Sequence, residues 1–427
     1  MITYRMKIRG LALAAGVGLA AISPARAETA ITFMGWVNMF DFQKPGWARI
    51  MENWNKAHPD IRINYVGTPA EDTLRQATAA ILAKRPPDIF QISASWVQQL
   101  DDQGALEPLG PLMGQDEIGR LWGTGVKALT IDGNIQGVPW LPAPTMWVYN
   151  RNLFRRAGLD PDKPPTSWSE FVAAVDKLCA LPPDANGKPF AVALRSSRDV
   201  IAMGSLPMFV WGFGGNTVDA QGKQDWTDAG AVKAFTWYRD TINKGCAPDA
   251  ADTQVARSLF AQGRAGFELD GPYIKGLVAT MSGGKLEFGP DKDAWVVPPL
   301  VGMDGKTRMY GGANVLAVSS ASPHKKEAAM FIRFLLDDPD SVNTFYQTSN
   351  QITTSNLDVI KDGPMGRDVF LKNYIDAWDN VNLLPIHSAR IDAILDQAGL
   401  SLQKIIKGAD IPGELKAMSR NMQDVDR

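Results

Sequence analysis

The sequence predicts an α/β fold built from two lobes, on three observations. The chain has 427 residues, and chains of this length usually split into domains of about 100 to 200 residues. Strand patterns alternate with helix patterns along both halves, which is typical of βαβ units around a parallel sheet. A proline-rich break at Pro139–Pro144 separates the halves, and the strand pattern restarts directly after it.

The first half carries three predicted strands, over residues 31–36, 61–65 and 89–92. Between them, apolar residues recur at three- and four-residue spacing, which predicts two amphipathic helices, around residues 47–54 and 74–81. Trp47 and Trp54 fall on the apolar stripe of the first of these helices, so we expect both in the core.

The second half opens with a predicted strand around residues 146–149. Ser167 and Glu170 then form a Ser-x-x-Glu capping box ahead of an apolar helical pattern, which indicates that a helix begins there. Three further elements are predicted by the same periodicities: a helix over 232–242, a strand over 315–318 and a helix over 322–336.

The N-terminus is typical of a secretory signal peptide. Arg5, Lys7 and Arg9 precede an apolar run over 11–22, and the small-residue tripeptide Ala25-Arg26-Ala27 follows. The run is shorter than the ~20 residues that a membrane-spanning helix needs, so a transmembrane anchor is the weaker alternative. We predict a signal peptide over residues 1–27 and an exported mature chain.

The charge balance argues against nucleic acid and anionic membranes as partners, and the two cysteines leave the presence of a disulfide open. Lys plus Arg number 44 against 46 Asp plus Glu, so the chain has no basic footprint for nucleic acid or an anionic membrane. Cys179 and Cys246 are able to form a disulfide in an exported protein if the fold brings them together, and two buried thiols are the alternative. His58, His324 and His387 show no metal-ligand spacing, and we expect neither metal nor cofactor.

Short motifs spread over nearly the whole chain resemble one known family. Each is weak alone, but their order and spacing match the extracellular solute-binding proteins of carbohydrate ABC importers, the group that includes the maltose-binding protein. The motifs are Pro86-Pro87-Asp88-Ile89, Gly104–Leu109, Gly137–Trp140, Tyr149–Phe154, Ala157-Gly158-Leu159, Pro165–Phe171, Phe260–Phe267 and Gly311-Gly312.

This resemblance implies a periplasmic-binding-protein-like fold of class II, in which two α/β lobes enclose a ligand cleft. Carried over to this sequence, the first lobe comprises residues 28–146 and 313–338, and the second comprises 147–312 and 339–427. Gly311-Gly312 then lies in a crossing between the lobes, where glycine gives a hinge its backbone freedom.

The resemblance also implies a function in transport rather than catalysis. We expect a periplasmic, monomeric protein that binds a sugar or sugar derivative by lobe closure and delivers it to a membrane permease. The alternatives within the binding class are an anionic sugar derivative, a glycerophosphodiester or a polyamine. A secreted glycoside hydrolase is a remote alternative, because it needs two carboxylates roughly 5 to 10 Å apart and the sequence offers no convincing pair.

A sugar site requires flat aromatic surfaces for the C–H face of the ring and short polar groups for its hydroxyls. Ligands of open α/β sheets bind beyond the carboxyl ends of the strands. Five candidates follow predicted strands of the first half: Trp36, Asn38, Ser93, Ser95 and Trp96. Core packing is the alternative for the two tryptophans, because aromatic side chains dominate cores as well.

Further candidates come from the second half of the chain. Trp211 and Phe213 flank a glycine-rich loop, with lobe packing as their alternative role. Asp270 and Tyr273 lie in a turn that in the family points into the cleft; Asp270 would accept sugar hydroxyls, unless it serves only the turn. The remaining candidates are Gly312 and Asn314 at the crossing and Arg390, which would favour an anionic ligand.

Overall fold

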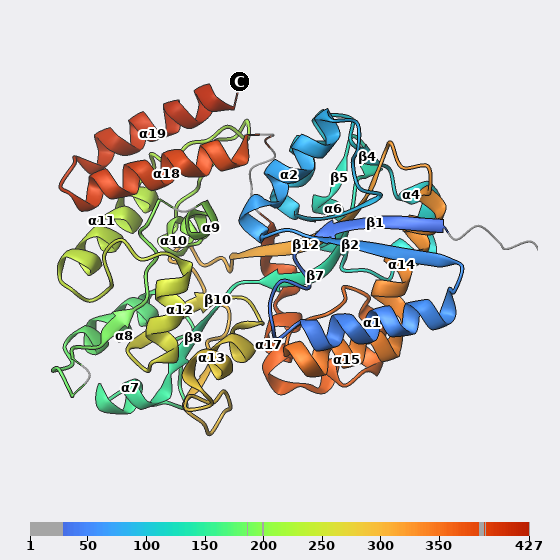
Figure 1. Ribbon diagram of the computed structural model, residues 1–427. Coiled ribbons are helices and arrows are strands. Elements are labelled where there is room, and N and C mark those ends of the chain that lie inside the picture. Colours follow the sequence, from blue (N-terminus) through green and yellow to red (C-terminus); the bar gives the residue numbers. More distant parts are fainter. Residues whose placement is uncertain (1–28, 186, 199, 384–387, 389, 427) are drawn as a thin grey trace, which may run out of the picture.

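The computed structural model describes residues 29–185, 187–198, 200–383, 388 and 390–426. The predicted signal peptide lies outside the described residues. The chain forms two α/β lobes side by side, each with its own sheet (Figure 1). This confirms the predicted fold class, and it follows from the alternation of strand and helix patterns in the sequence.

The sheet of the first lobe runs in the order β13-β12-β3-β1-β2, with β4 and β7 also paired to β12. β1 is parallel to both β2 and β3, whereas β12 runs antiparallel to β3. The strands are β1 (Thr29–Gly35), β2 (Ile61–Gly67), β3 (Ile89–Ser93), β4 (Leu106–Glu107), β7 (Val138–Pro144), β12 (Met309–Ser319) and β13 (Val381–Leu383). The strands predicted over 31–36, 61–65, 89–92 and 315–318 are therefore present.

Helices surround this sheet, and the longer ones bury an apolar face. They are α1 (Lys44–Ala57), α2 (Ala70–Leu82), α14 (Lys325–Asp337) and α15 (Pro339–Ser349), with the shorter α3 (Val97–Asp102), α4 (Gly110–Met113), α5 (Gln115–Ile118) and α6 (Gly123–Ala128). Trp47 and Trp54 of α1 are buried in the core with Phe33 and Phe331, as the spacing predicts. A two-stranded ribbon, β5 (Thr130–Ile131) and β6 (Asn134–Ile135), precedes β7.

The sheet of the second lobe has the order β11-β8-β10-β9, and only β9 and β10 are parallel neighbours. Its strands are β8 (Met146–Asn150), β9 (Phe190–Val192), β10 (Ala265–Asp270) and β11 (Ala294–Val296). The surrounding helices include α7 (Arg151–Arg156), α8 (Trp168–Cys179), α9 (Val200–Met203), α10 (Leu206–Gly212), α11 (Ala229–Asn243), α12 (Thr253–Ala261) and α13 (Ile274–Ser282). Ser167 caps α8 by accepting the Glu170 amide at 3.3 Å, so that helix begins where the capping box predicts.

A disulfide joins Cys179, the last residue of α8, to Cys246 in the turn after α11. The two Cα atoms are 5.0 Å apart, within the range that the bond requires. Cys246 also lies beside the sheet, because its carbonyl accepts the Ala191 amide of β9 at 2.7 Å. The disulfide thus ties two outer helices of the second lobe to its edge strand.

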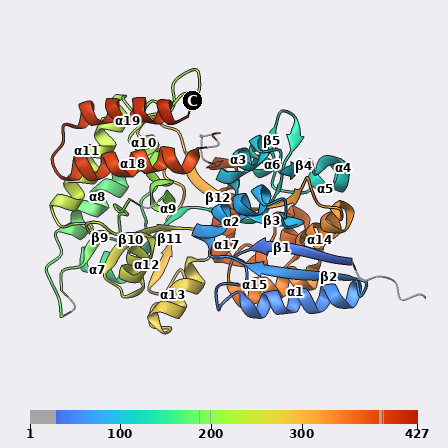
Figure 2. The ribbon, with the colours of Figure 1, turned by 45° about the horizontal axis from the view of Figure 1, so that its top comes forward.

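The C-terminal part of the chain divides between the lobes differently from the predicted boundary at residue 338. Helix α15 packs on α1 and β13 extends the first sheet, so residues 339–349 and 381–383 lie with the first lobe. The boundary fails because α15 buries its apolar face against α1. After it come α16 (Leu357–Asp362) and α17 (Val369–Asp376). Then α18 (Ile391–Ile406) and α19 (Ile411–Val425) return to the second lobe beside α11, as both views show (Figure 2).

Residues 370–378 connect the two lobes on the side of α17. The ring of Phe370 lies 5.2 Å from that of Phe288 and 6.0 Å from that of Trp295, both from the second lobe. Trp378 lies 5.3 Å from Trp122 of the first lobe. None of the helices in the described part of the chain combines the length and apolar character needed to span a membrane.

Candidate functional site

Two tryptophans form an aromatic wall at the edge of the first sheet. Trp36 follows β1 and Trp96 follows β3, and because β1 and β3 are parallel neighbours their carboxyl ends meet at one edge. The two ring centroids are 6.0 Å apart with an interplanar angle of 75°, an edge-to-face contact. Both side chains are only half-buried, so each keeps an accessible ring surface.

Small polar groups surround this aromatic wall. The hydroxyls of Ser93 and Ser95 lie 2.9 Å apart, and Asn314 pairs with Ser93 across the β3–β12 ladder. At Gly312 of β12 a Cβ atom would meet no other atom within 4 Å, which leaves open space beside the crossing. Asn38 is held through its backbone amide, which donates to the Tyr65 hydroxyl at 3.1 Å. The structure therefore brings hydroxyl and amide groups to the same edge as the tryptophans.

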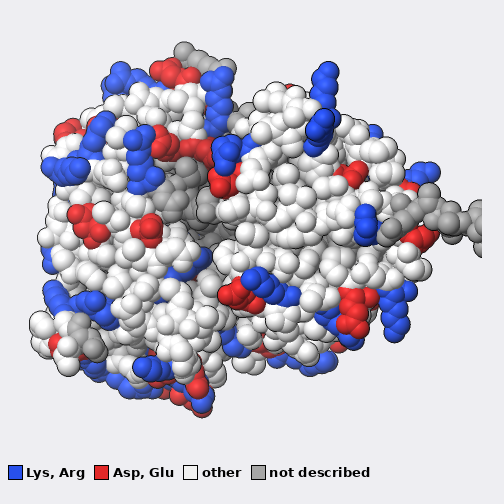
Figure 3. Space-filling model, viewed as in Figure 1, with Lys and Arg blue, Asp and Glu red and all other residues white. Residues whose placement is uncertain are grey.

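Trp96 connects the aromatic wall to the second lobe, where its ring packs against the apolar core. The indole Nε1 of Trp96 donates to Asp392 Oδ1 of α18 at 3.4 Å. Burial raises the pKa of Asp392, while the bond from Trp96 opposes that shift. On the face shown in Figure 3, basic and acidic side chains are interspersed on both sides of the line where the two lobes meet. Trp96 therefore lies at a contact between the two lobes.

A buried ion cluster lies at the carboxyl edge of the second sheet, where β9 and β10 end. It consists of Arg195, Arg257, Glu268 and Asp270, each less than a tenth exposed apart from the Arg257 side chain at 13%. Arg257 Nε and Nη2 donate to the two oxygens of Asp270 at 2.6 and 3.0 Å. Arg195 Nη2 donates to Glu268 Oε1 at 2.7 Å and lies 3.5 Å from Asp270 Oδ2.

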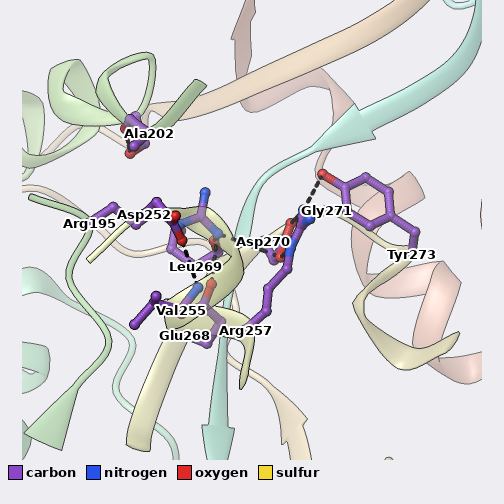
Figure 4. Close-up of polar contacts among 11 residues, drawn as sticks. Arg195, Ala202, Asp252, Val255, Arg257, Glu268, Leu269, Asp270, Gly271 and Tyr273 are labelled. Carbon is purple, nitrogen blue, oxygen red and sulfur yellow. Dashed lines mark hydrogen bonds and ion pairs between the residues drawn. The ribbon is translucent and has the colours of Figure 1, made fainter. Parts of the chain in front are cut away.

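This arrangement corrects the expectation that Asp270 accepts sugar hydroxyls. Both of its oxygens face arginines, and Oδ1 also accepts the Gly271 amide at 2.8 Å. Instead, Asp270 holds Arg257, which lies between Asp270 and Tyr273 (Figure 4). The guanidinium contacts the Tyr273 hydroxyl at 3.3 Å and lies 5.3 Å from the ring centroid. Asp270, Arg257 and Tyr273 therefore form one connected polar group.

The comparisons with known proteins identify the family. A family model described as "Bacterial extracellular solute-binding protein" matches residues 41–340. The chain belongs to this family. A maltotriose-binding protein of Pyrococcus abyssi is 22% identical over 399 residues, covering 91% of this chain and 82% of the relative.

Solved structures show the same fold. A tagatose-bound solute-binding protein of an ABC transporter from Thermotoga lettingae aligns with a TM-score of 0.81 and 20% identity, over 93% of this chain and all of the other. The maltose-bound MalE3 of T. maritima aligns with a TM-score of 0.77 and 20% identity, over 93% and 99% of the two chains. The family binds solutes for transport, so the predicted binding role is confirmed and the glycoside hydrolase is not favoured.

Three predicted site residues of this solute-binding protein lie elsewhere. Trp211 is only 6% exposed within the second-lobe core, and the Phe213 ring packs 6.0 Å from Trp168 and 5.9 Å from Trp237. Both contacts fit lobe packing, the alternative named for these residues. Arg390 is exposed, and its guanidinium donates to the Val425 carbonyl at the end of α19 at 3.0 Å. The structure does not bring these three side chains to the aromatic wall.

Sequence reasoning missed Gln91, Asp392 and the two arginines of the ion cluster. The sequence does carry a signal for Gln91, which is a polar residue inside an apolar strand. It carries an indirect signal for the arginines, because their partners Glu268 and Asp270 alternate with apolar residues of β10. Buried polar and charged groups are retained only with partners, so such residues predict a network. Which partners they find is set by the tertiary structure.

The cluster predicts a pH dependence of stability for this solute-binding protein. Burial raises the pKa of Glu268 from its ordinary value of 4.5 to about 7, against the opposing charge of Arg195. The folded state then holds this proton more tightly than the unfolded state. The Glu268 contribution to stability is therefore complete at low pH and is lost as the pH rises through about 7.

Urea unfolding of the wild type and Glu268→Gln at about pH 5 and about pH 8 measures this contribution, because glutamine does not titrate. We expect the wild type to lose stability relative to Glu268→Gln as the pH rises over this interval. A difference between the two proteins that is constant with pH would contradict the raised pKa.

Proposed function

We propose that this protein is the periplasmic substrate-binding component of an ABC importer, and that it captures a sugar or sugar derivative between its lobes. The family assigns solute binding. The observation that carries the choice of a sugar is the half-buried pair Trp36–Trp96 beside serine and asparagine side chains. Relatives named for maltotriose, maltose and tagatose support it. The signal-peptide pattern over residues 1–27 supports the periplasmic location.

The chemistry of a sugar suits these side chains. One face of a pyranose ring is made of C–H groups, which pack on an indole, and aromatic packing contributes about 0.5 to 1.5 kcal/mol beyond burial of area. The equatorial hydroxyls both donate and accept, as do the hydroxyls of Ser93 and Ser95 and the amide of Asn314. The ligand is therefore held by shape and hydrogen bonds, with no bond made or broken.

Lobe closure couples binding to transport. A ligand on the aromatic wall would also touch the second lobe near Asp392, which Trp96 contacts, so it stabilises the closed arrangement more than the open one. The crossing at Gly311-Gly312, where β12 pairs with β7, is the joint that we propose for that motion. We propose that the closed form acts as a monomer and delivers the sugar to the membrane permease of the importer.

A ligand screen tests the proposal. The mature chain is heated with glucose, maltose, maltotriose, tagatose, a sugar acid, a glycerophosphodiester and a polyamine in separate samples. A ligand present at 100 times its dissociation constant adds about 2.7 kcal/mol of stability, which is a readily measured rise in melting temperature. We expect stabilisation by a neutral saccharide. Stabilisation by the anions or the polyamine alone would overturn the sugar assignment.

Truncating one tryptophan tests the aromatic wall. We expect Trp96→Ala to weaken saccharide binding by roughly 30-fold, equivalent to about 2 kcal/mol, because one ring face and the bond to Asp392 are lost together. Trp96→Phe keeps a ring and should lose less. Isothermal titration calorimetry measures both, with Trp237→Ala in the second-lobe helix α11 as the matched control. Equal affinities for Trp96→Ala and the control would exclude Trp96 from the site.

A further inference from the structure

Gln91 is a polar residue in the middle of a buried strand. It lies in β3 between Phe90 and Ile92, and all three residues are 0% exposed. A buried amide without partners costs stability, so a glutamine at this position needs hydrogen bonds. Its side chain makes three, and all of them go to segments that form the candidate site.

The amide oxygen of Gln91 holds the turn that carries Trp36. Oε1 accepts the backbone N–H of Trp36 at 2.9 Å and that of Val37 at 3.0 Å. Both residues lie just beyond the end of β1 at Gly35, where the strand no longer supplies partners for backbone amides. Gln91 therefore replaces the missing partners and determines where the chain leaves the sheet.

The contact with Gln91 requires a glycine at position 35. A Cβ atom at residue 35 would lie 2.4 Å from Gln91 Oε1 and 2.5 Å from Gln91 Cβ. No real side chain tolerates such distances, so only glycine lets the amide approach the turn. The pair Gly35 and Gln91 is thus a fitted contact between neighbouring parallel strands.

The amide nitrogen of Gln91 connects the same turn to the crossing strand. Nε2 donates to Asn314 Oδ1 at 3.2 Å, and Asn314 Nδ2 donates to the Leu141 carbonyl of β7 at 3.4 Å. Asn314 stands two residues beyond Gly312 on β12. One side chain therefore joins the aromatic wall to the strand that leads into the second lobe.

We propose that Gln91 is a positioning residue for ligand binding: it fixes the backbone of Trp36 against β12, so that Trp36 stands edge-on to Trp96 before any ligand arrives. Because the aromatic wall is already ordered in the free protein, ligand binding does not have to order it. Gln91 therefore raises the affinity for the ligand without contacting the ligand itself. The effect on affinity rests on the proposed sugar site, whereas the effect on Trp36 does not.

The test uses Gln91→Met, which keeps the length of the side chain and removes its hydrogen bonds. The mature chain is labelled with 5-fluorotryptophan, and the resonances of Trp36 and Trp96 are assigned from Trp36→Phe and Trp96→Phe. Without ligand, we expect Gln91→Met to shift or broaden these two fluorine resonances and to leave those of the other tryptophans in place. Gln136→Met, the same change at another buried glutamine of the first lobe, is the matched control.

Affinity is then measured with maltotriose as the probe. We expect Gln91→Met to bind about tenfold more weakly than both the wild type and Gln136→Met. If Gln91→Met does not fold, Asn314→Ala removes the connection to β12 alone and should shift the Trp36 resonance in the same way. Unmoved fluorine resonances, or an unchanged maltotriose affinity beside moved ones, would overturn the proposal. If the wild type fails to bind maltotriose, that probe fails as a ligand, and the ligand-free spectrum decides the role of Gln91.

Discussion

Replacement of Asp270 with asparagine is expected to lower the free energy of unfolding by about 3 to 5 kcal/mol, because it leaves buried positive charge without its counter-charge. Arg257 would lose the carboxylate that accepts its Nε and Nη2 groups, and Arg195 would keep Glu268 as its remaining carboxylate partner. Burial raises the pKa of Asp270, but the charges of Arg257 and Arg195 outweigh it and hold that pKa below its ordinary value. The carboxyl is therefore ionised, and both arginines depend on its charge.

An exposed ion pair provides the matched control. Asp376 accepts Lys372 Nζ on α17 with both side chains more than half exposed, and exposed helix pairs contribute only about 0.3 to 0.5 kcal/mol. Urea unfolding near neutral pH measures Asp270→Asn and Asp376→Asn side by side. A loss for Asp270→Asn no larger than that of the control would mean that the cluster is not a stabilising network.

The variant Asp270→Asn also distinguishes a role of Asp270 in ligand binding from a role in stability. If it accepted sugar hydroxyls, as the turn motif suggested, Asp270→Asn would weaken saccharide binding while leaving stability nearly unchanged. The contacts instead predict a large loss of stability and little change in saccharide affinity, because both Asp270 oxygens bond to groups of the protein. Calorimetry at a temperature where the variant remains folded distinguishes these outcomes.

Removal of the disulfide is the second change with a large expected effect. The double variant Cys179→Ser, Cys246→Ser should lose about 4 kcal/mol of stability, the entropy of closing a loop across a sequence separation of 67 residues. Because α8 and α11 belong to the second lobe, we expect that lobe to melt at a lower temperature while the first lobe is little changed. Differential scanning calorimetry follows both transitions.

Reduction of the wild type is the control for this variant. Under a strong reductant its melting profile should approach that of the double variant, whose own profile should not respond to the reductant. A wild type that melts identically with and without reductant would show that the bond contributes no stability, in which case Cys179 and Cys246 are better described as two packed thiols.

Local sequence patterns predicted much of the fold of this protein. The alternation of strands and helices predicted two α/β lobes, and the capping box at Ser167 marked the start of α8. Trp36 and Trp96 were each predicted as ligand contacts because each follows a strand. That β1 and β3 are parallel neighbours, which brings the two rings together, is a finding of the structure. Periodicity and strand ends depend on a few neighbouring residues, so they can be predicted before the fold is known.

Only the tertiary structure decided how several side chains are used. Asp270 occupies an Asp-Gly turn whatever surrounds it, but Arg195 and Arg257 reach it from other segments and take up its oxygens. Trp211 is buried by the packing of α10, and the ion pairs and the disulfide join residues that the sequence separates widely. The environment of a side chain is set by such distant contacts, and no local sequence pattern specifies them.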